Sequence, residues 1–321
     1  MPKPLVSITC LTYKHEEYIR DCLEGFLFQK TNFPFEVLIH DDASPDSTPQ
    51  IIREYTAKYP DIIKPILRET NLHSVPGHRC INLVNLERAQ GKYVAICEGD
   101  DFWCDPYKLQ KQFDLLESHP DYTLCGCGIY YLNHLTKSYT PQGFPAEEWP
   151  LPQDVACKRI FFNNHPFHMS AAFFRMDTMR AVEDIIQRDV MNAPMGDTQL
   201  FYHLATQGKV AYIRERMLTY RQHGSSFSAY DNVEKAKRFK QRSLDAHVRM
   251  ANNNNHPEWA EEFRKLAEEE LSTITPSSMT LPRLIRQKIT NLKRFIRGDY
   301  ANFRKYLALS PAERVRMFAE S

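Results

Sequence analysis

Two adjacent carboxylates follow an apolar run about a third of the way along this chain. The run is Tyr93–Cys97, and the segment after it reads Glu98-Gly99-Asp100-Asp101. An ionised carboxylate at the mouth of a buried strand loses hydration unless a cation meets it there. Mg²⁺ and Mn²⁺ prefer carboxylate oxygens and are usually completed by substrate phosphates. The segment therefore predicts either a divalent metal site or a surface turn, since Gly-Asp-Asp is also common in turns.

A second aspartate pair, Asp41-Asp42, follows another apolar run, Phe35–Ile39. Ligands of parallel sheets bind at the carboxyl ends of the strands, so both pairs are expected in one cleft. The proline in the run at 62–67 predicts an edge strand. Near-continuous apolar runs that alternate with helical segments are typical of a mainly parallel sheet covered on both faces. The pattern up to residue 103 predicts strands at 5–11, 35–39, 62–67 and 93–97 and helices at 16–29, 46–59 and 78–90.

Beyond Trp103 the pattern is less regular. From residue 231 the chain reads as helical, with a break at 252–255 and a linker at 275–278. We therefore predict an α/β domain over 1–230 and a helical C-terminal extension over 231–321. Within the first part, we expect helices at 106–117 and 197–208, strands near 122–132, 169–175 and 210–213, and a proline-rich loop over 138–157.

Composition limits the class of protein. The 321 residues are 42% hydrophobic and 25% charged with a formal net charge of +1, so no global field directs the chain toward nucleic acid. The N-terminus lacks the apolar core of a signal peptide, and no stretch approaches the ~18 apolar residues of a membrane span. We expect a cytoplasmic protein. Reduced structural thiols, rather than disulfides or a metal site, are expected for the eight cysteines, at 10, 22, 80, 97, 104, 125, 127 and 157.

Several segments together resemble glycosyltransferase family 2, whose members are nucleotide-diphospho-sugar transferases with the GT-A fold. They are residues 6–13, 35–44 and 89–101, the dipeptide Gly196-Asp197 and a last element at 220–226, in the family's order. The resemblance implies a Rossmann-like α/β fold with a mixed, mainly parallel sheet flanked by helices. It implies metal-dependent, inverting transfer of a hexosyl or N-acetylhexosaminyl group, with Mn²⁺ or Mg²⁺ as cofactor. The donor would be a UDP-sugar, and the acceptor a hydroxyl of a glycan or lipid-linked molecule in bacterial cell-surface polysaccharide synthesis.

The resemblance also implies donor-side roles. Asp101 aligns with the family's metal-ligating aspartate, and Asp100 is expected at the ribose or the sugar. Asp42 fits the carboxylate that accepts a hydrogen bond from the uracil ring NH. Thr12 and Tyr13 would line the nucleoside pocket, Tyr13 by stacking, with core packing as the alternative. A metal between carboxylate and diphosphate would stabilise the charge that builds on the leaving phosphate.

Attack by an acceptor hydroxyl needs a general base on the face opposite the leaving group. Asp197 matches the position of the family's catalytic carboxylate. The alternative is an ordinary helix N-cap, for which Asp is a favoured residue. Many relatives carry Glu-Asp here, whereas this chain has Gly196-Asp197. That departure leaves the base in place and removes a neighbouring acid.

Five further residues complete the expected site. His223 would complete the metal or meet the diphosphate, and Arg221 would pair with phosphate through its planar fork. His165 and His168 are expected on the acceptor side. Trp103 is expected either in the wall of the sugar pocket or in the core.

The segment 281–305 lies outside the resemblance. Apolar residues recur there at helical spacing, and the segment contains eight Lys and Arg residues but only one acid, Asp299. A basic amphipathic helix predicts peripheral contact with an anionic membrane at the inner face of the plasma membrane. The alternative is packing on its own catalytic domain or on a homodimer partner.

Two other functions remain open to the sequence. A sugar nucleotidyltransferase would also use a carboxylate-bound metal, but it normally carries a glycine-rich basic loop near the first strand. Residues 12–17 are neither glycine-rich nor strongly basic. A catalytically degenerate nucleotide-sugar-binding scaffold would keep the fold without turnover. The presence of Asp42, Asp101, Asp197 and His223 argues against it.

Overall fold

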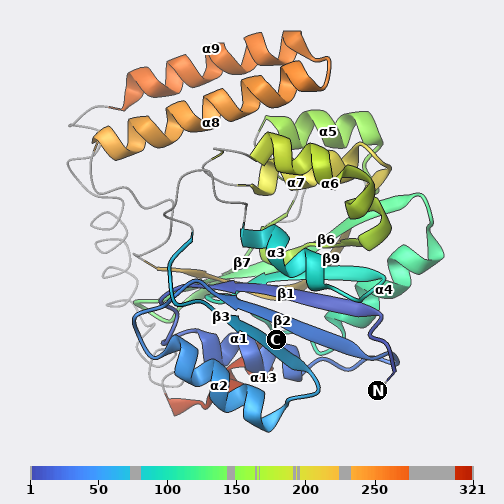
Figure 1. The fold of residues 1–321 in the computed structure, drawn as a ribbon, viewed down its shortest axis with the longest axis vertical. Helices are drawn as coiled ribbons and strands as arrows, with labels where there is room; N and C mark the ends of the chain where they lie inside the picture. Colours follow the sequence, from blue (N-terminus) through green and yellow to red (C-terminus); the bar gives the residue numbers. More distant parts are fainter. Residues whose placement is uncertain are drawn as a thin grey trace.

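The computed structural model describes residues 2–72, 81–142, 149–162, 165, 167–190, 193, 196–223, 233–274 and 308–319. These residues build a nine-stranded mixed sheet with helices on both faces (Figure 1). The strands are β1 (Val6–Thr12), β2 (Phe35–Asp41), β3 (Ile63–Leu67), β4 (Tyr93–Glu98), β5 (Phe102–Trp103), β6 (Tyr122–Asn133), β7 (Tyr139–Pro141), β8 (Phe173–Arg175) and β9 (Lys209–Gln222). The helices are α1 (Ile19–Leu27), α2 (Thr48–Lys58), α3 (Ile81–Arg88), α4 (Lys108–Ser118), α5 (Gln153–Phe161), α6 (Met176–Val190), α7 (Asp197–Ala205), α8 (Val233–Asn253), α9 (Pro257–Thr273) and α13 (Pro311–Ala319).

The N-terminal half has the predicted parallel strands. The sheet order is β3-β2-β1-β4-β8-β6-β9-β5, with β7 paired to β6, and β3 lies at the edge as its proline predicts. The register places Asp41 beside Thr12 and Glu98 beside Leu11. Both aspartate pairs therefore follow strands that end next to the end of β1, which confirms the shared edge.

The C-terminal half adds the antiparallel part of the sheet. Strand β8 pairs antiparallel with β4 and β6, while β6 and β9 run parallel with register shifts. The two residues of β5 pair with Leu218 and Thr219 of β9. The segment between β4 and β5 is therefore held at both ends by the sheet. Residues 98–101, which are this segment together with Glu98 at the end of β4, are called the acidic loop below.

Three expectations for this half differ from the structure. Strand β9 extends to Gln222, well beyond the predicted 210–213, because the exposed residues Arg214 and Glu215 lie at a register shift, after which the pairing with β6 continues. Residues 153–161, predicted as loop, form α5 because their apolar residues fall on one buried helical face. The predicted strand at 169–175 begins as a 3₁₀ turn, Met169–Ala171, and only its end pairs as β8.

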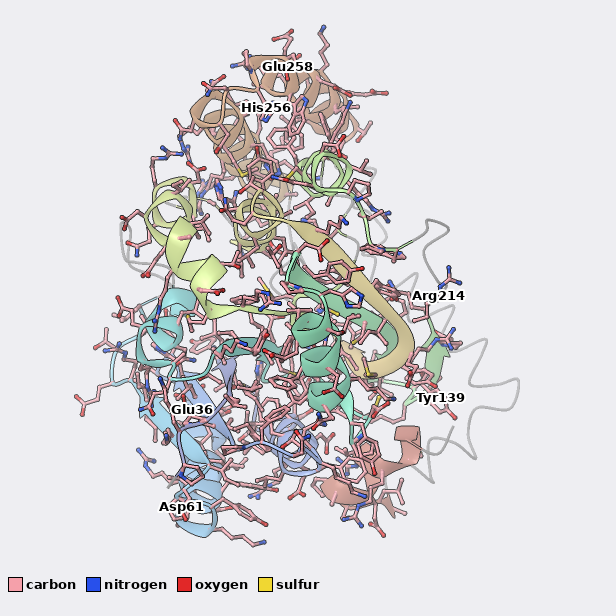
Figure 2. All side chains as sticks on the ribbon, turned by 90° about the vertical axis from the view of Figure 1, so that its right-hand side faces the viewer. Glu36, Asp61, Tyr139, Arg214, His256 and Glu258 are labelled. Atoms are coloured by element: carbon pink, nitrogen blue, oxygen red, sulfur yellow. The ribbon has the colours of Figure 1, made fainter. Side chains whose placement is uncertain are left out.

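Helices cover the sheet unequally. In Figure 1, α1, α2 and α13 lie below the sheet, and α5 to α9 lie above it. Figure 2 shows His256 and Glu258 at the far end of the α8–α9 hairpin, distant from Glu36 and Asp61. The hairpin packs through aromatic rings, including the stacked rings of His247 and Phe263 with centroids 4.1 Å apart.

The C-terminal helices do not stand apart from the α/β part. Phe161 of α5 contacts Trp259 and Phe263 of α9, and α13 packs on α1. The division at residue 230 stays a prediction, and the basic segment 281–305 lies outside the described residues. Among the helices that the structure describes, none combines the length and apolarity that a bilayer crossing requires.

Candidate active site

The acidic loop gathers three carboxylates at the carboxyl end of β4. Ligand oxygens of Glu98, Asp100 and Asp101 lie within 4.8 Å of one another. The Gly99 amide donates to Leu11 O at 2.8 Å, which ties the loop to β1. A Cβ on this glycine would lie 2.8 Å from the Cβ of Thr12, so only glycine fits this close approach.

Asp101 is the most enclosed of the three. It has no exposed surface, Ser170 Oγ donates to its Oδ2 at 2.6 Å, and the Arg221 amide donates to its Oδ1 at 2.9 Å. Burial and the charges of Asp100 and Glu98 raise the pKa of Asp101 well above its ordinary value. Both oxygens of Asp101 accept hydrogen bonds inside the protein, and Asp101 still belongs to the group of carboxylates that could hold a metal ion. The metal-ligand role of Asp101 therefore stays a prediction.

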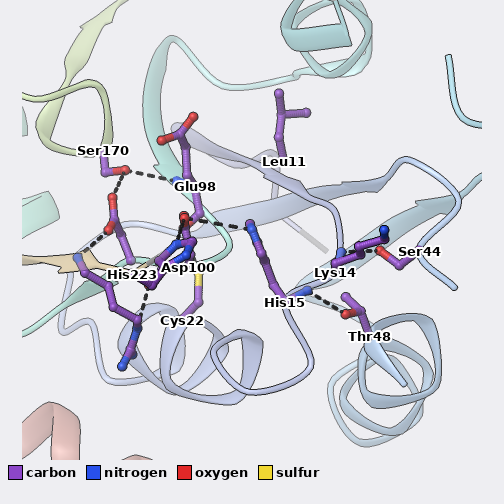
Figure 3. A network of polar contacts seen from close by, with 12 residues as sticks. Leu11, Lys14, His15, Cys22, Ser44, Thr48, Glu98, Asp100, Ser170 and His223 are labelled. Carbon is purple, nitrogen blue, oxygen red and sulfur yellow. Dashed lines mark hydrogen bonds and ion pairs between the residues drawn. The ribbon is translucent and has the colours of Figure 1, made fainter. Parts of the chain in front are cut away.

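Asp100 faces the site instead. Its side chain is 18% exposed, and His223 Nε2 lies 2.8 Å from its Oδ2 (Figure 3). His15 approaches the same oxygen, with Nε2 at 3.8 Å. Burial opposes ionisation, but the hydrogen bond from His223 and the charges of both histidines lower the pKa of Asp100 to about 2.

Two residues that lie next to Asp100 and His223, namely His15 and Tyr18, were not predicted as site residues from the sequence. His15 lies after the end of β1, where a single histidine in a loop shows no pattern. The ring of Tyr18 lies beside both histidines, with centroids 6.0 Å from His15 and 4.9 Å from His223. Its only sequence signal is its place just before α1, and its contact to His223 joins segments about 200 residues apart.

Arg221 does not face a phosphate position with its fork. Its side chain is only 2% exposed, Nη2 donates to Asp21 Oδ2 at 2.9 Å, and Nε donates to the carbonyl of Asp100 at 2.8 Å. The guanidinium also lies over the rings of Tyr18 and Phe102. These contacts differ from the expected phosphate-binding role. The Arg221 side chain instead connects the acidic loop to Asp21 of α1.

Trp103 has the second of its two expected roles, packing in the core, and does not line a sugar pocket. The side chain is completely buried, and its indole NH donates to Ser170 O at 2.9 Å. Its ring packs on Phe26 and receives the ammonium of Lys108 at 4.1 Å. A side chain without exposed surface cannot line a sugar pocket, so core packing is the role observed.

The expected nucleoside side lies at the ends of β1 and β2. Tyr13 is 40% exposed and therefore not a core residue, whereas Thr12 is buried with no hydrogen-bond partner for its hydroxyl among the described residues. Asp42 Oδ1 accepts from the Leu72 amide at 2.8 Å. Asp41 accepts from the amide and hydroxyl of Ser44, so it closes the turn after β2.

Asp197 lies near the acidic loop, because its charge is among the causes that raise the pKa of Glu98. It is the first residue of α7, and the N-cap is Gly196, so the alternative N-cap role for Asp197 is not observed. His165 Nδ1 lies 3.8 Å from Asp197 Oδ2, and His165 Nε2 lies 2.9 Å from Thr198 Oγ1. Desolvation by the surrounding protein is the largest cause that raises the pKa of Glu98 to about 8, and the charges of Asp100 and Asp197 add to it. The Glu98 side chain nevertheless keeps solvent contact.

His168 borders the same site. Its Nδ1 lies 3.7 Å from Asp101 Oδ2, and its ring lies 4.0 Å from that of Tyr220. Burial lowers the pKa of His168 to about 4, so the imidazole is neutral at pH 7. The structure thus brings His165, His168, Asp197, the acidic loop and His223 together. Tyr13 and Asp42 follow β1 and β2 at the same sheet edge.

Comparison with known proteins decides the family. The sequence profile of Glycosyl transferase family 2 matches residues 7–182, more than half of the chain. The chain belongs to glycosyl transferase family 2. An uncharacterized protein of Mycobacterium tuberculosis is 38% identical over 232 residues, which cover 72% of this chain and 63% of that protein. This chain therefore spans less than two thirds of the length of that relative.

Other matches are more distant. An uncharacterized glycosyltransferase of Methanocaldococcus jannaschii is 29% identical over 170 residues, which cover 51% of this chain and 53% of that protein. The structure of S. aureus TarS 1–349 in complex with UDP-GlcNAc aligns with a TM-score of 0.57 and 18% identity, over 98% of this chain and 90% of that chain. At this identity the match confirms the GT-A fold alone.

Proposed function

We propose that this family 2 member transfers a sugar from a nucleotide-diphosphate donor, most simply a UDP-sugar, to a hydroxyl of a glycan or lipid-linked acceptor. The observation that carries the proposal is that a separate carboxylate, Asp197, lies close enough to the acidic loop for its charge to act on Glu98. His223 contacts Asp100 of the acidic loop, and Asp197 lies beside His165 at the start of α7. The reaction needs a site for the diphosphate and a separate general base, and we assign these roles to the acidic loop and to Asp197.

The acidic loop fits a divalent ion. Carboxylate oxygens and an imidazole suit Mn²⁺, and carboxylates suit Mg²⁺. We assign Glu98, Asp100 and Asp101, whose ligand oxygens lie within 4.8 Å of one another, together with His223, as the residues that would hold it. The hydrogen bonds that Asp101 accepts from Ser170 and the Arg221 amide also position the loop. A bound ion would offset the negative charge of the leaving diphosphate without a proton donor.

Asp197 is proposed as the general base of a single in-line displacement with inversion. Its carboxylate starts a helix, keeps solvent access and lies near His165, which is placed to orient it. Neutral His168 would donate or accept a hydrogen bond with the acceptor sugar. On the donor side, Tyr13 would stack on the base and Asp42 would accept from the base NH.

The cellular setting is proposed from relatives. A Bacillus subtilis protein named as a candidate teichuronic acid biosynthesis glycosyltransferase is 35% identical over 114 residues. This supports a role in cell-surface polysaccharide synthesis, for a hexosyl or N-acetylhexosaminyl donor. Cytoplasmic placement, membrane contact through 281–305 and a homodimer stay predictions. Liposome sedimentation with and without residues 280–321 tests the membrane contact, and equal sedimentation would contradict it.

Two substitutions separate the proposed roles. Asp100→Asn should remove the Mn²⁺ dependence of UDP binding measured by calorimetry. Asp197→Asn should keep that binding and reduce turnover by at least about a hundredfold, the range expected for loss of a general base. Asp177→Asn is a matched control, because Asp177 also accepts from the amide of the next threonine at the start of a helix.

The outcomes are distinct. Normal turnover by Asp197→Asn would contradict the base assignment. Binding of UDP by the unsubstituted chain without turnover of any donor would favour the nucleotide-sugar-binding scaffold instead.

A further inference from the structure

The last described helix, α13, contacts residues that support the acidic loop. It lies in the sequence after residues 7–182, which match the family. Helix α13 packs on α1, and Arg314 Nη1 lies 3.3 Å from Asp21 Oδ1. Val315 of α13 is completely buried in a small apolar cluster with Phe102 and Leu132. Phe102 directly follows Asp101, so α13 packs against the residue next to the end of the acidic loop.

Asp21 connects α13 to the acidic loop through Arg221. The other Asp21 oxygen, Oδ2, accepts from Arg221 Nη2 at 2.9 Å. Arg221 in turn donates from Nε to the carbonyl of Asp100 and from its backbone amide to Asp101 Oδ1. A continuous set of charge-assisted hydrogen bonds therefore runs from α13 to both aspartates of the loop.

Burial makes this set sensitive to the loss of one member. The side chains of Asp21 and Arg221 are 1% and 2% exposed, whereas that of Arg314 is 22% exposed. Charges removed from water depend on their partners, and each oxygen of Asp21 meets a different guanidinium. Without Arg314, Asp21 would lose the contact on Oδ1 and would shift relative to Arg221, which holds the loop carbonyl.

We propose that Arg314 is a positioning residue for the donor site, acting through Asp21 and Arg221 to fix the acidic loop. This proposal rests on the proposed function for its effect on donor binding. The C-terminal helix thereby completes a site whose other residues come from the α/β part.

The test uses Arg314→Ala in the full chain with two companions. Arg314→Lys keeps the charge, and Arg316→Ala is a matched control on the same helix, where Arg316 lies over the ring of Phe28. Hydrogen exchange of the peptide covering residues 93–104 reports on the loop without any ligand. Calorimetry with UDP and Mn²⁺ reports on the proposed donor site.

We expect Arg314→Ala to exchange faster at residues 98–103 and to bind UDP with Mn²⁺ about tenfold more weakly, a size seen for residues that contact neither ligand. Arg314→Lys should restore most of both properties, and Arg316→Ala should match the unsubstituted chain. Unchanged loop exchange in Arg314→Ala, or equal changes in Arg314→Ala and Arg316→Ala, would overturn the proposal. If the unsubstituted chain binds no UDP, the proposed function fails, and the exchange data still decide the role of Arg314.

Discussion

Asp189 is a buried carboxylate, and the effect of removing its charge on folding stability can be calculated from its pKa. It has no exposed surface, and its oxygens meet His203 at 2.8 Å and the side-chain amides of Asn253 and Asn254 at 2.8 and 3.2 Å. Burial opposes ionisation, but the hydrogen bonds from His203, Arg188 and Asn253 outweigh it and lower the pKa from 3.8 to about 2. By linkage, that difference corresponds to roughly 2 kcal/mol of folding stability for the ionised carboxylate.

The network joins α6, α7 and α8, so it also fixes the helix that begins at Asp197. Asp189→Asn keeps the shape and removes the charge, and we expect it to lower the free energy of unfolding at pH 7 by about 2 kcal/mol. Because the folded pKa is depressed, this stability is present above pH ~4 and is lost as pH falls toward 2. The difference between the two proteins should therefore shrink below pH 4.

Urea unfolding followed by circular dichroism at pH 7, 5, 4 and 3 measures this difference. Asp184→Asn is the matched control, because Asp184 is exposed on the same helix. Equal stability of Asp189→Asn and the unsubstituted chain at pH 7 would refute the reasoning. A loss that stays constant down to pH 3 would also refute it, since the effect would then not come from ionisation.

Two further substitutions test the packing around the site. Gly126→Ala would place a Cβ 2.0 Å from Cγ of the Phe167 ring, so we expect a loss of about 1–3 kcal/mol in urea unfolding, partly restored by adding Phe167→Leu. Lys108 is fully buried, donates to Gln112 at 2.6 Å, and has a pKa lowered by burial. Lys108→Met should leave the urea midpoint equal or higher, because a buried ammonium is costly to hold; a clear fall in the midpoint would contradict this.

The first half of the fold could be predicted from the sequence because its strands are buried on both faces. Such strands read as continuous apolar runs, and their spacing shows the parallel order. Strand β9 could not be predicted in full because Arg214–Arg216 interrupts its apolar pattern. Helix α5 was missed because prolines at 150 and 152 dominate the local signal just before it begins.

The site residues divide in the same way. Asp100, Asp197 and His223 carry a motif, so the sequence indicates them. Which aspartate of the acidic loop faces the site depends on backbone direction after β4, and the spacing alone does not define it. The role of Arg221 depends on Asp21, a residue 200 positions earlier in the chain, and no local pattern reports that contact.

The proposed transfer of a sugar is tested most directly by UDP release from a panel of UDP-sugars. The purified chain would be assayed with Mn²⁺, simple glycoside acceptors and, in parallel, EDTA. We predict release from at least one UDP-sugar that requires both Mn²⁺ and Asp197. Release that persists with EDTA and in Asp197→Asn would contradict the proposal, as would tight UDP binding without release from any donor.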